Sequence, residues 1–126
     1  MISKEFILGF NDQVIEKVSI PEWNNAECYV RSITAKEQDT WSLEASKQKK
    51  ESRVNFQASL LVLCMCDNKG KLLFSPQDAD ALGSKNAGAI NRLFNVACRL
   101  NGLSSDEVKE LEKNSVTPQG ENSIYV

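Results

Sequence analysis

Cysteine is the residue type most suited to nucleophilic or metal chemistry in this chain, because its 126 residues include no histidine. The four cysteines are Cys28, Cys64, Cys66 and Cys98. Cys64 and Cys66 fall within a predicted helix, where an offset of two residues turns side chains about 200° apart. Such a pair is poorly placed to chelate one ion, and no histidine completes the site. We therefore expect four buried, reduced cysteines without a metal or catalytic role.

Serine and carboxylate groups do not form a recognisable catalytic site either. A nucleophile needs an adjacent base, and the Ser-x-x-Lys arrangement at Ser46 lies in a solvated run of charges. The acid pair Asp78 and Asp80 is explained by a helix start. The segment from Asp67 to Lys71 lacks the remaining oxygen ligands of a calcium loop, and no glycine-rich phosphate-binding motif occurs. The sequence thus predicts no enzyme activity, no metal and no cofactor.

The net charge and the hydropathy of the chain argue against nucleic acid and membranes as partners. The net charge of −2 argues against non-specific nucleic-acid binding, which usually requires a basic excess on one face. No apolar run approaches the roughly 20 residues that span a bilayer. The first residues lack the features of a secretion signal. We expect a cytoplasmic protein that binds neither nucleic acid nor membrane.

The N-terminal third predicts an antiparallel β-hairpin. Residues 1–12 contain an apolar cluster around Phe6 that fits a short helix or a strand docked on the body. The runs from Val14 to Ile20 and from Glu27 to Ile33 are rich in β-branched residues, and the first alternates as a half-buried strand does. Between them, Pro21 stops the ladder and the Asn24–Asn25 pair tolerates positive φ. We expect Trp23 to cover one end of the hairpin.

About five short helices are predicted after the hairpin, in an α+β fold that is mostly α. The first follows a capping box, Thr34 to Glu37, and the second is strongly apolar. A turn that ends at Gly70 and an extended segment then lead to a short helix. A cleaner amphipathic helix follows, with Ile90, Leu93, Phe94, Ala97 and Leu100 on one side. The helices are expected at 34–48, 54–66, 75–83, 84–100 and 104–113. The turn is expected at 67–70 and the extended segment at 72–74.

Two domain-level expectations follow from this pattern. Residues 1–113 should form one compact domain, since the chain is long enough for a modest core. Residues 114–126 are mainly polar, with one proline and one glycine, and should form a flexible C-terminal tail.

The charged side of the amphipathic helix is a candidate for contact with an acidic partner. Arg92, Asn95 and Arg99 recur there at helical spacing, although an ordinary solvent-exposed face is the plainer interpretation. A basic cluster could meet phosphates, but it lacks nearby aromatic groups for base stacking. That cluster comprises Lys47, Lys49, Lys50 and Arg53.

An ordered series of segments resembles the tail assembly chaperones of siphophages and related prophages. The similarity covers most of the chain, from Val14 to Ser115, and no single segment is diagnostic. The segments are VSIPEW (18–23), YVRSI (29–33), TAKE (34–37), LVLCMCDNKGKLLF (61–74), SPQDADALG (75–83), NRLF (91–94), LNGLS (100–104) and EKNS (112–115).

The resemblance implies a non-enzymatic role in building the phage tail within the host bacterial cytoplasm. Such proteins bind the tape measure protein, keep its partly apolar helices soluble and help recruit tail tube subunits. The tube protein is contacted through a longer form made by ribosomal frameshifting, and neither form is expected in the mature virion. Apolar groups beyond the needs of the core are candidates for tape measure or homo-oligomer contacts. These candidates are Phe6, Trp41, Leu72 and Phe74, with the apolar segment around Phe6.

Two alternatives come from other classes. A helix-turn-helix DNA-binding regulator could use the helices between Pro76 and Leu100, but the chain offers few further basic residues there. A structural phage component, such as a connector or tail terminator, would remain in the virion.

Overall fold

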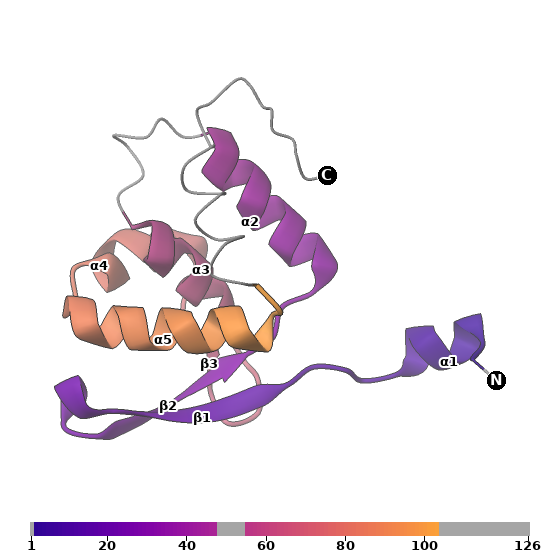
Figure 1. Cartoon of the computed structure of the whole chain (residues 1–126), viewed down its shortest axis with the longest axis horizontal. Helices are drawn as coiled ribbons and strands as arrows, with labels where there is room; N and C mark the ends of the chain where they lie inside the picture. The colour runs from indigo at the N-terminus through magenta and orange to yellow at the C-terminus, as the bar shows by residue number, and fades with distance from the viewer. Residues whose placement is uncertain (1, 48–54, 104–126) are drawn as a thin grey trace.

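The computed structural model describes residues 2–47 and 55–103 (Figure 1). An antiparallel sheet lies beneath a layer of helices, and α1 stands apart from both (Figure 1). The α+β fold class, with an N-terminal hairpin followed by helices, is confirmed. The elements are α1 (Lys4–Gly9), β1 (Ile15–Ile20), η1 (Pro21–Trp23), β2 (Ala26–Arg31), α2 (Ala35–Lys47), α3 (Phe56–Cys64), β3 (Met65–Cys66), η3 (Pro76–Asp78), α4 (Ala79–Gly83) and α5 (Ala87–Leu100), where η marks a short 3-10 helix.

The hairpin of β1 and β2 forms as its sequence predicts. Ile20 pairs with Ala26 across a connection in which Asn24 and Asn25 adopt left-handed φ values of 57° and 59°. Asparagine tolerates this conformation better than most residues, which allows the tight reversal after η1. Val18 and Ile20 face the helices and are buried, while Ile15, Lys17 and Ser19 are exposed.

The third strand corrects one sequence-based expectation. A helix was expected to run through Cys66, but α3 ends at Cys64 and the next two residues form β3. There Met65 pairs with Val30 and Cys66 pairs with Tyr29, in antiparallel register. The free edge of β2 supplies the backbone partners that end the helix, and an apolar run alone does not distinguish a buried helix from a buried strand. The two cysteines therefore do not share a helix.

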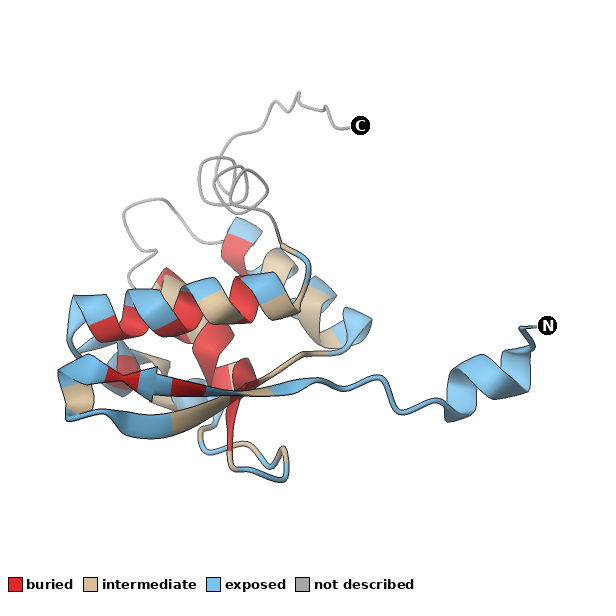
Figure 2. Cartoon of the chain, turned by 60° about the horizontal axis from the view of Figure 1, so that its bottom comes forward, coloured by how far each residue is buried: buried red, intermediate tan, exposed pale blue. Residues whose placement is uncertain are grey.

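Helix α3 is the centre of the core. Leu60 and Leu61 are fully buried, and residues of α3 pack against α2, α4 and α5. Helix α5 contributes the predicted apolar stripe, in which Leu93 and Ala97 have no exposed surface. Figure 2 shows the buried residues concentrated between the sheet and the helices, with α1 wholly exposed.

The predicted caps and turns are confirmed where the structure describes them. The backbone N–H of Glu37 donates to Thr34 Oγ1 and the N–H of Thr34 donates to Glu37 Oε1, which completes the capping box of α2. The carboxylate of Asp78 accepts the N–H of Ser75 at 2.9 Å. Gly70, with φ of 89°, closes the turn after β3.

Several expectations lie outside the described residues. These are the end of the basic cluster (Lys49, Lys50 and Arg53), the helix expected over 104–113 and the tail expected over 114–126.

Candidate protein-binding surfaces

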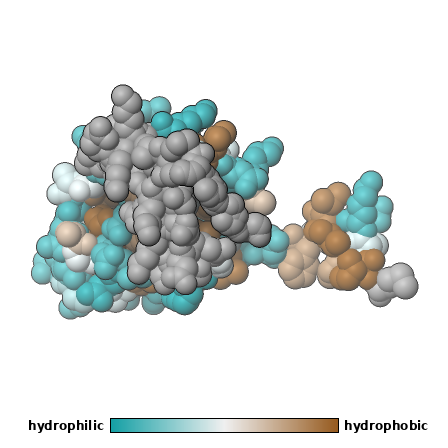
Figure 3. All heavy atoms as spheres, turned by 45° about the horizontal axis from the view of Figure 1, so that its top comes forward, coloured by the Kyte–Doolittle hydropathy of each residue, from teal (hydrophilic) through white to brown (hydrophobic). Residues whose placement is uncertain are grey.

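The first candidate surface is the arm, which we define as residues 2–10. Its helix α1 begins at Ser3, whose Oγ accepts the N–H of Phe6 at 3.1 Å. No residue of α1 is buried, and the side chain of Leu8 is 76% exposed. Figure 3 shows hydrophobic atoms gathered on the arm, apart from the body of the molecule.

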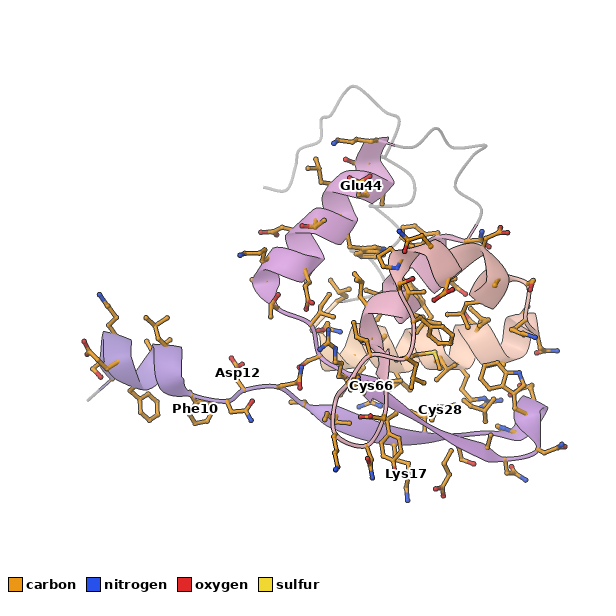
Figure 4. All side chains as sticks on the ribbon, turned by 180° about the vertical axis from the view of Figure 1, so that it is seen from behind. Phe10, Asp12, Lys17, Cys28, Glu44 and Cys66 are labelled. Atoms are coloured by element: carbon orange, nitrogen blue, oxygen red, sulfur yellow. The ribbon has the colours of Figure 1, made fainter. Side chains whose placement is uncertain are left out.

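An aromatic pair occupies one side of the arm. The rings of Phe6 and Phe10, four residues apart, have centroids 5.5 Å from each other. Ile7 and Leu8 point in other directions around the helix, so the arm is apolar on more than one side. Phe10 stands at the body end of α1, away from the side chains of the sheet and helices (Figure 4). Since few soluble proteins leave so many large apolar groups in water, the arm is a candidate contact surface.

The arm joins the body at a fixed point. The N–H of Val14 donates to Ser32 Oγ at 2.9 Å, and the N–H of Ser32 donates to the carbonyl of Val14 at 2.8 Å. These bonds extend the pairing of the hairpin by one step beyond β1. Only residues 11–13 lie between the arm and this anchor, so the linker is short.

The second candidate surface is the α4 pocket, of about 390 Å³, at the end of the molecule where β1 turns into η1. Its volume falls near the lower end of the range for ligand-binding pockets. Trp23 and Phe74 are both half-buried, and each packs against the core. The pocket is lined by Trp23, Phe74, Ala81, Leu82 and Lys85.

Leu72 and Trp41, two further candidates predicted from the sequence, differ in how far they are buried. Leu72 is half-buried and bridges to Cys66 at the margin of the sheet. Trp41 is only 4% exposed, and its indole N–H donates to Ser59 Oγ at 2.8 Å. Its ring packs against that of Phe56, with centroids 5.2 Å apart and the ring planes tilted by 41°. Trp41 is therefore a core residue, and the interpretation of it as surplus apolar surface is wrong because α3 supplies both a hydrogen-bond acceptor and an aromatic partner.

The third candidate surface is the charged side of α5. Arg92 and Arg99 reach the hairpin and form two-point ion pairs with Glu22 and Glu16, with nearest N–O distances of 3.0 and 2.7 Å. Asn95 lies between them and is exposed. The predicted helical spacing is confirmed, but both arginines already neutralise acids of their own chain.

These ion pairs lower the pKa values of the two glutamates. The hydrogen bond from Arg99 holds the pKa of Glu16 below its usual value, and that from Arg92 does the same to the pKa of Glu22. A charge-assisted pair favours the ionised carboxylate, so both acids are negative at neutral pH. The two arginines of the charged side of α5 are consequently engaged in intramolecular ion pairs, which leaves little free positive charge there.

Cys64, Cys66 and Cys98 are buried as expected, whereas Cys28 is only half-buried because it lies on the hairpin at the margin of the core. Burial raises the pKa of Cys64 to about 12 and that of Cys98 to about 11, so both remain protonated thiols at neutral pH. Within residues 2–47 and 55–103, no three histidine, cysteine or acidic side chains gather as a metal site would require. Asp67 instead stabilises the turn after β3, since its Oδ1 accepts the N–H groups of Lys69 and Lys71.

The family model described as phage tail assembly chaperone matches residues 8–114, which is most of the chain. This chain belongs to the phage tail assembly chaperone family. The family is generally non-catalytic. No curated protein gave a significant match.

A solved structure supports the fold of this family member. The "Structure of bacteriophage HK97 tail assembly chaperone" matches with a TM-score of 0.60 at 17% sequence identity. The match covers 81% of this chain and 95% of the HK97 chain. At this identity the likeness concerns the fold alone.

Two observations concern membrane insertion and DNA binding by this family member. In the described part of the chain, no helix is long and apolar enough to cross a membrane. A helix-turn-helix reader would need free basic groups on its recognition helix. Arg92 and Arg99 are instead paired with acids, which weighs against α5 as such a helix.

The sequence-based prediction did not include every residue of the candidate surfaces of this family member. Leu82 and Lys85 were not singled out, because a short helix carries no sign that its side chains meet Trp23 and Phe74. Ile7 and Leu8 were recognised only as part of an apolar cluster. The turn at Pro21 could have indicated where Trp23 lies but not which helix it faces.

Proposed function

We propose that this chain is a non-enzymatic tail assembly chaperone that binds the tape measure protein in the host bacterial cytoplasm. Family membership supports the role in tail assembly. The observation that supports tape measure binding is the exposed apolar surface of the arm, where Ile7 and Leu8 are 57% and 76% exposed. Apolar helices of a partner would cover this surface and would themselves be shielded from water.

Recruitment of tail tube subunits is the second half of the proposal. In this scheme a longer, frameshift-extended form contacts the tube protein, while the arm of this chain holds the tape measure protein. Neither form stays in the finished particle. Mass spectrometry of purified virions tests the last point, because abundant peptides of this chain there would favour a connector or tail terminator instead.

Co-expression with the cognate tape measure protein tests the central claim. We expect the tape measure protein to be mostly soluble with the full chain and mostly aggregated without it. The double substitution Ile7→Ser and Leu8→Ser should lower the soluble fraction several-fold, because it removes apolar surface and leaves the core intact. Lys4→Ser is the matched control on the same helix and should change nothing. A tape measure protein equally soluble with and without the chain would refute the proposal.

A further inference from the structure

We propose that the α4 pocket is closed by residues 121–126 of the same chain, with Ile124, Tyr125 and Val126 placed against the rings of Trp23 and Phe74. This segment acts as an internal competitor, because an apolar side chain of a partner can enter the pocket only by displacing it. The contact lies within one copy and is separate from tape measure binding at the arm.

The size of the α4 pocket favours a few side chains over a helix. One turn of helix, 10 Å wide and 5.4 Å long, occupies about 420 Å³, which is more than the 390 Å³ of the pocket. The lining is mostly apolar and includes two aromatic rings. Filling it with apolar side chains removes apolar surface from water on both sides of the contact. The pocket therefore suits an extended segment with two or three large apolar side chains in sequence.

Residues 121–126 contain such a sequence. Ile124, Tyr125 and Val126 are consecutive, whereas residues 114–123 contain a single aliphatic residue, Val116. Tyr125 supplies an aromatic ring, and aromatic groups favour offset or edge-to-face contact with rings such as those of Trp23 and Phe74. Its hydroxyl group can remain in water at the mouth of the pocket.

Charge supports the same assignment. Lys85 lines the pocket, and among the described residues it belongs to no ion pair. Glu121 is the only charged residue of the sequence 114–126, and it precedes Ile124 by three positions. In an extended segment these positions are about 10 Å apart, which is about one Debye length at 0.1 M salt. Attraction between the carboxylate and the ammonium would orient the segment.

The length of chain beyond α5 permits the contact. The described residues end at Leu103, next to the C-terminal end of α5, while Lys85 lies just before α5 begins (Figure 1). The 14 residues of α5 separate these two points by about 21 Å. Ile124 follows Leu103 by 21 positions, which reach about 70 Å when extended and still about 50 Å when half are helical. The segment can therefore reach the pocket.

The arm cannot fill the pocket of its own copy. Val14 is anchored to Ser32, and Phe10 is only four residues before it, so the Cα atoms of Phe10 and Val14 are at most about 14 Å apart. From Val14 to Ile20 the strand extends about 20 Å towards the pocket end. Phe10 therefore falls short of the pocket, whereas Ile124 does not.

The tether lowers the affinity that the segment needs. A linker of about 20 residues gives an effective concentration in the millimolar range. At about 1 mM, a segment whose free peptide binds with a Kd of about 0.1 mM is docked about nine-tenths of the time. Such an affinity is modest for two or three buried apolar side chains.

Acrylamide quenching of tryptophan fluorescence measures whether the pocket is covered. Trp41 is only 4% exposed, so quenching reports mainly on Trp23, the other tryptophan of the chain. A chain that ends at Gly120 should be quenched at least about twofold more strongly than the full chain, because the ring of Trp23 loses its cover. Ile124→Ser with Tyr125→Ser should have the same effect in the full chain. Val116→Ser is the matched control outside the docking segment and should match wild type.

A peptide added in trans identifies the pocket as the acceptor. A synthetic peptide of residues 119–126, at about 1 mM, should restore the protection of Trp23 in the chain that ends at Gly120. The same peptide with Tyr125→Ser should not. Ala81→Arg fills the pocket from an exposed position of α4, keeps a good helix former there and should abolish the effect of the peptide. Circular dichroism checks that each variant is folded.

Several results would overturn the proposal. Equal quenching of the full chain and the chain that ends at Gly120 would exclude a cover by this segment. A peptide that also protects the Ala81→Arg variant would exclude the α4 pocket. Protection of the full chain that is lost on dilution from about 50 to about 1 μM would show that the segment binds a second copy. Because the measurement uses this chain alone, its failure is distinguishable from a failure of the tape measure assay.

Discussion

Arg99 of α5 binds both carboxylate oxygens of Glu16 on β1, at 3.1 and 2.7 Å, across 83 positions of sequence. Arg92 binds Glu22 of η1 in the same two-point manner. Together they attach α5 to the hairpin at two points along the helix. Helix α5 covers the sheet, so the ion pairs link the two layers of the fold.

We predict that this link depends on pH. The folded pKa values of Glu16 and Glu22 are lowered, so the pairs stabilise the fold above the unfolded value of about 4.3 and lose that contribution as pH falls through the folded pKa. Arg92→Gln with Arg99→Gln should lower the urea midpoint at pH 7, and its difference from wild type should shrink by pH 3. Lys17→Gln, which loses only an exposed contact of 3.7 Å to Glu27, should match wild type throughout. A difference that is the same at both pH values would contradict this prediction.

A second prediction concerns Asn101 at the end of α5. Its Oδ1 accepts the N–H of Ile33 at 2.8 Å, and its Nδ2 donates to the carbonyl of Ala97 at 2.8 Å. Asn101→Ala leaves the Ile33 N–H without this acceptor and should cost about 1–3 kcal/mol of unfolding free energy. Asn95→Ala is the matched control on the exposed side of α5 and should cost little. Urea unfolding measures both, and equal losses would show that the Ile33 bond is unimportant.

A third prediction tests the core placement of Trp41. Trp41→Ala should cost about 3–5 kcal/mol, because it removes a buried ring that packs on Phe56. Trp41→Phe should cost less, since it keeps most of the ring contact and loses the hydrogen bond to Ser59. Denaturant unfolding gives both values. A near-neutral Trp41→Ala variant would mean that Trp41 is a surface residue after all.

The fourth prediction concerns thiol reactivity. In the native chain at pH 8, Cys28 should react first with a soluble thiol reagent, because it is half-buried while the other three cysteines are buried. Burial also raises the pKa of Cys64 to about 12, which suppresses its thiolate. Cys28→Ser should therefore abolish the fastest phase. All four thiols of the wild type should react in denaturant. A fast phase that survives Cys28→Ser would contradict the burial of the others.

Local features of this fold could be predicted from the sequence because they depend on neighbours a few residues away. The capping box of Thr34 and Glu37 is one example, and the left-handed Asn24 and Asn25 are another. Each satisfies or bends the backbone within its own turn. The apolar stripe of α5 is likewise visible, since burial on one face follows from helical periodicity.

Only the tertiary structure decided how those elements pair. Strand β3 exists because Met65 and Cys66 meet the free edge of β2, 35 or more positions earlier. Trp41 is buried because α3 presents Ser59 and Phe56 to it. The arginines of α5 are neutralised because β1 and η1 place Glu16 and Glu22 next to them. Contacts between distant residues depend on how whole elements pack, and local propensity and periodicity carry no information about that packing.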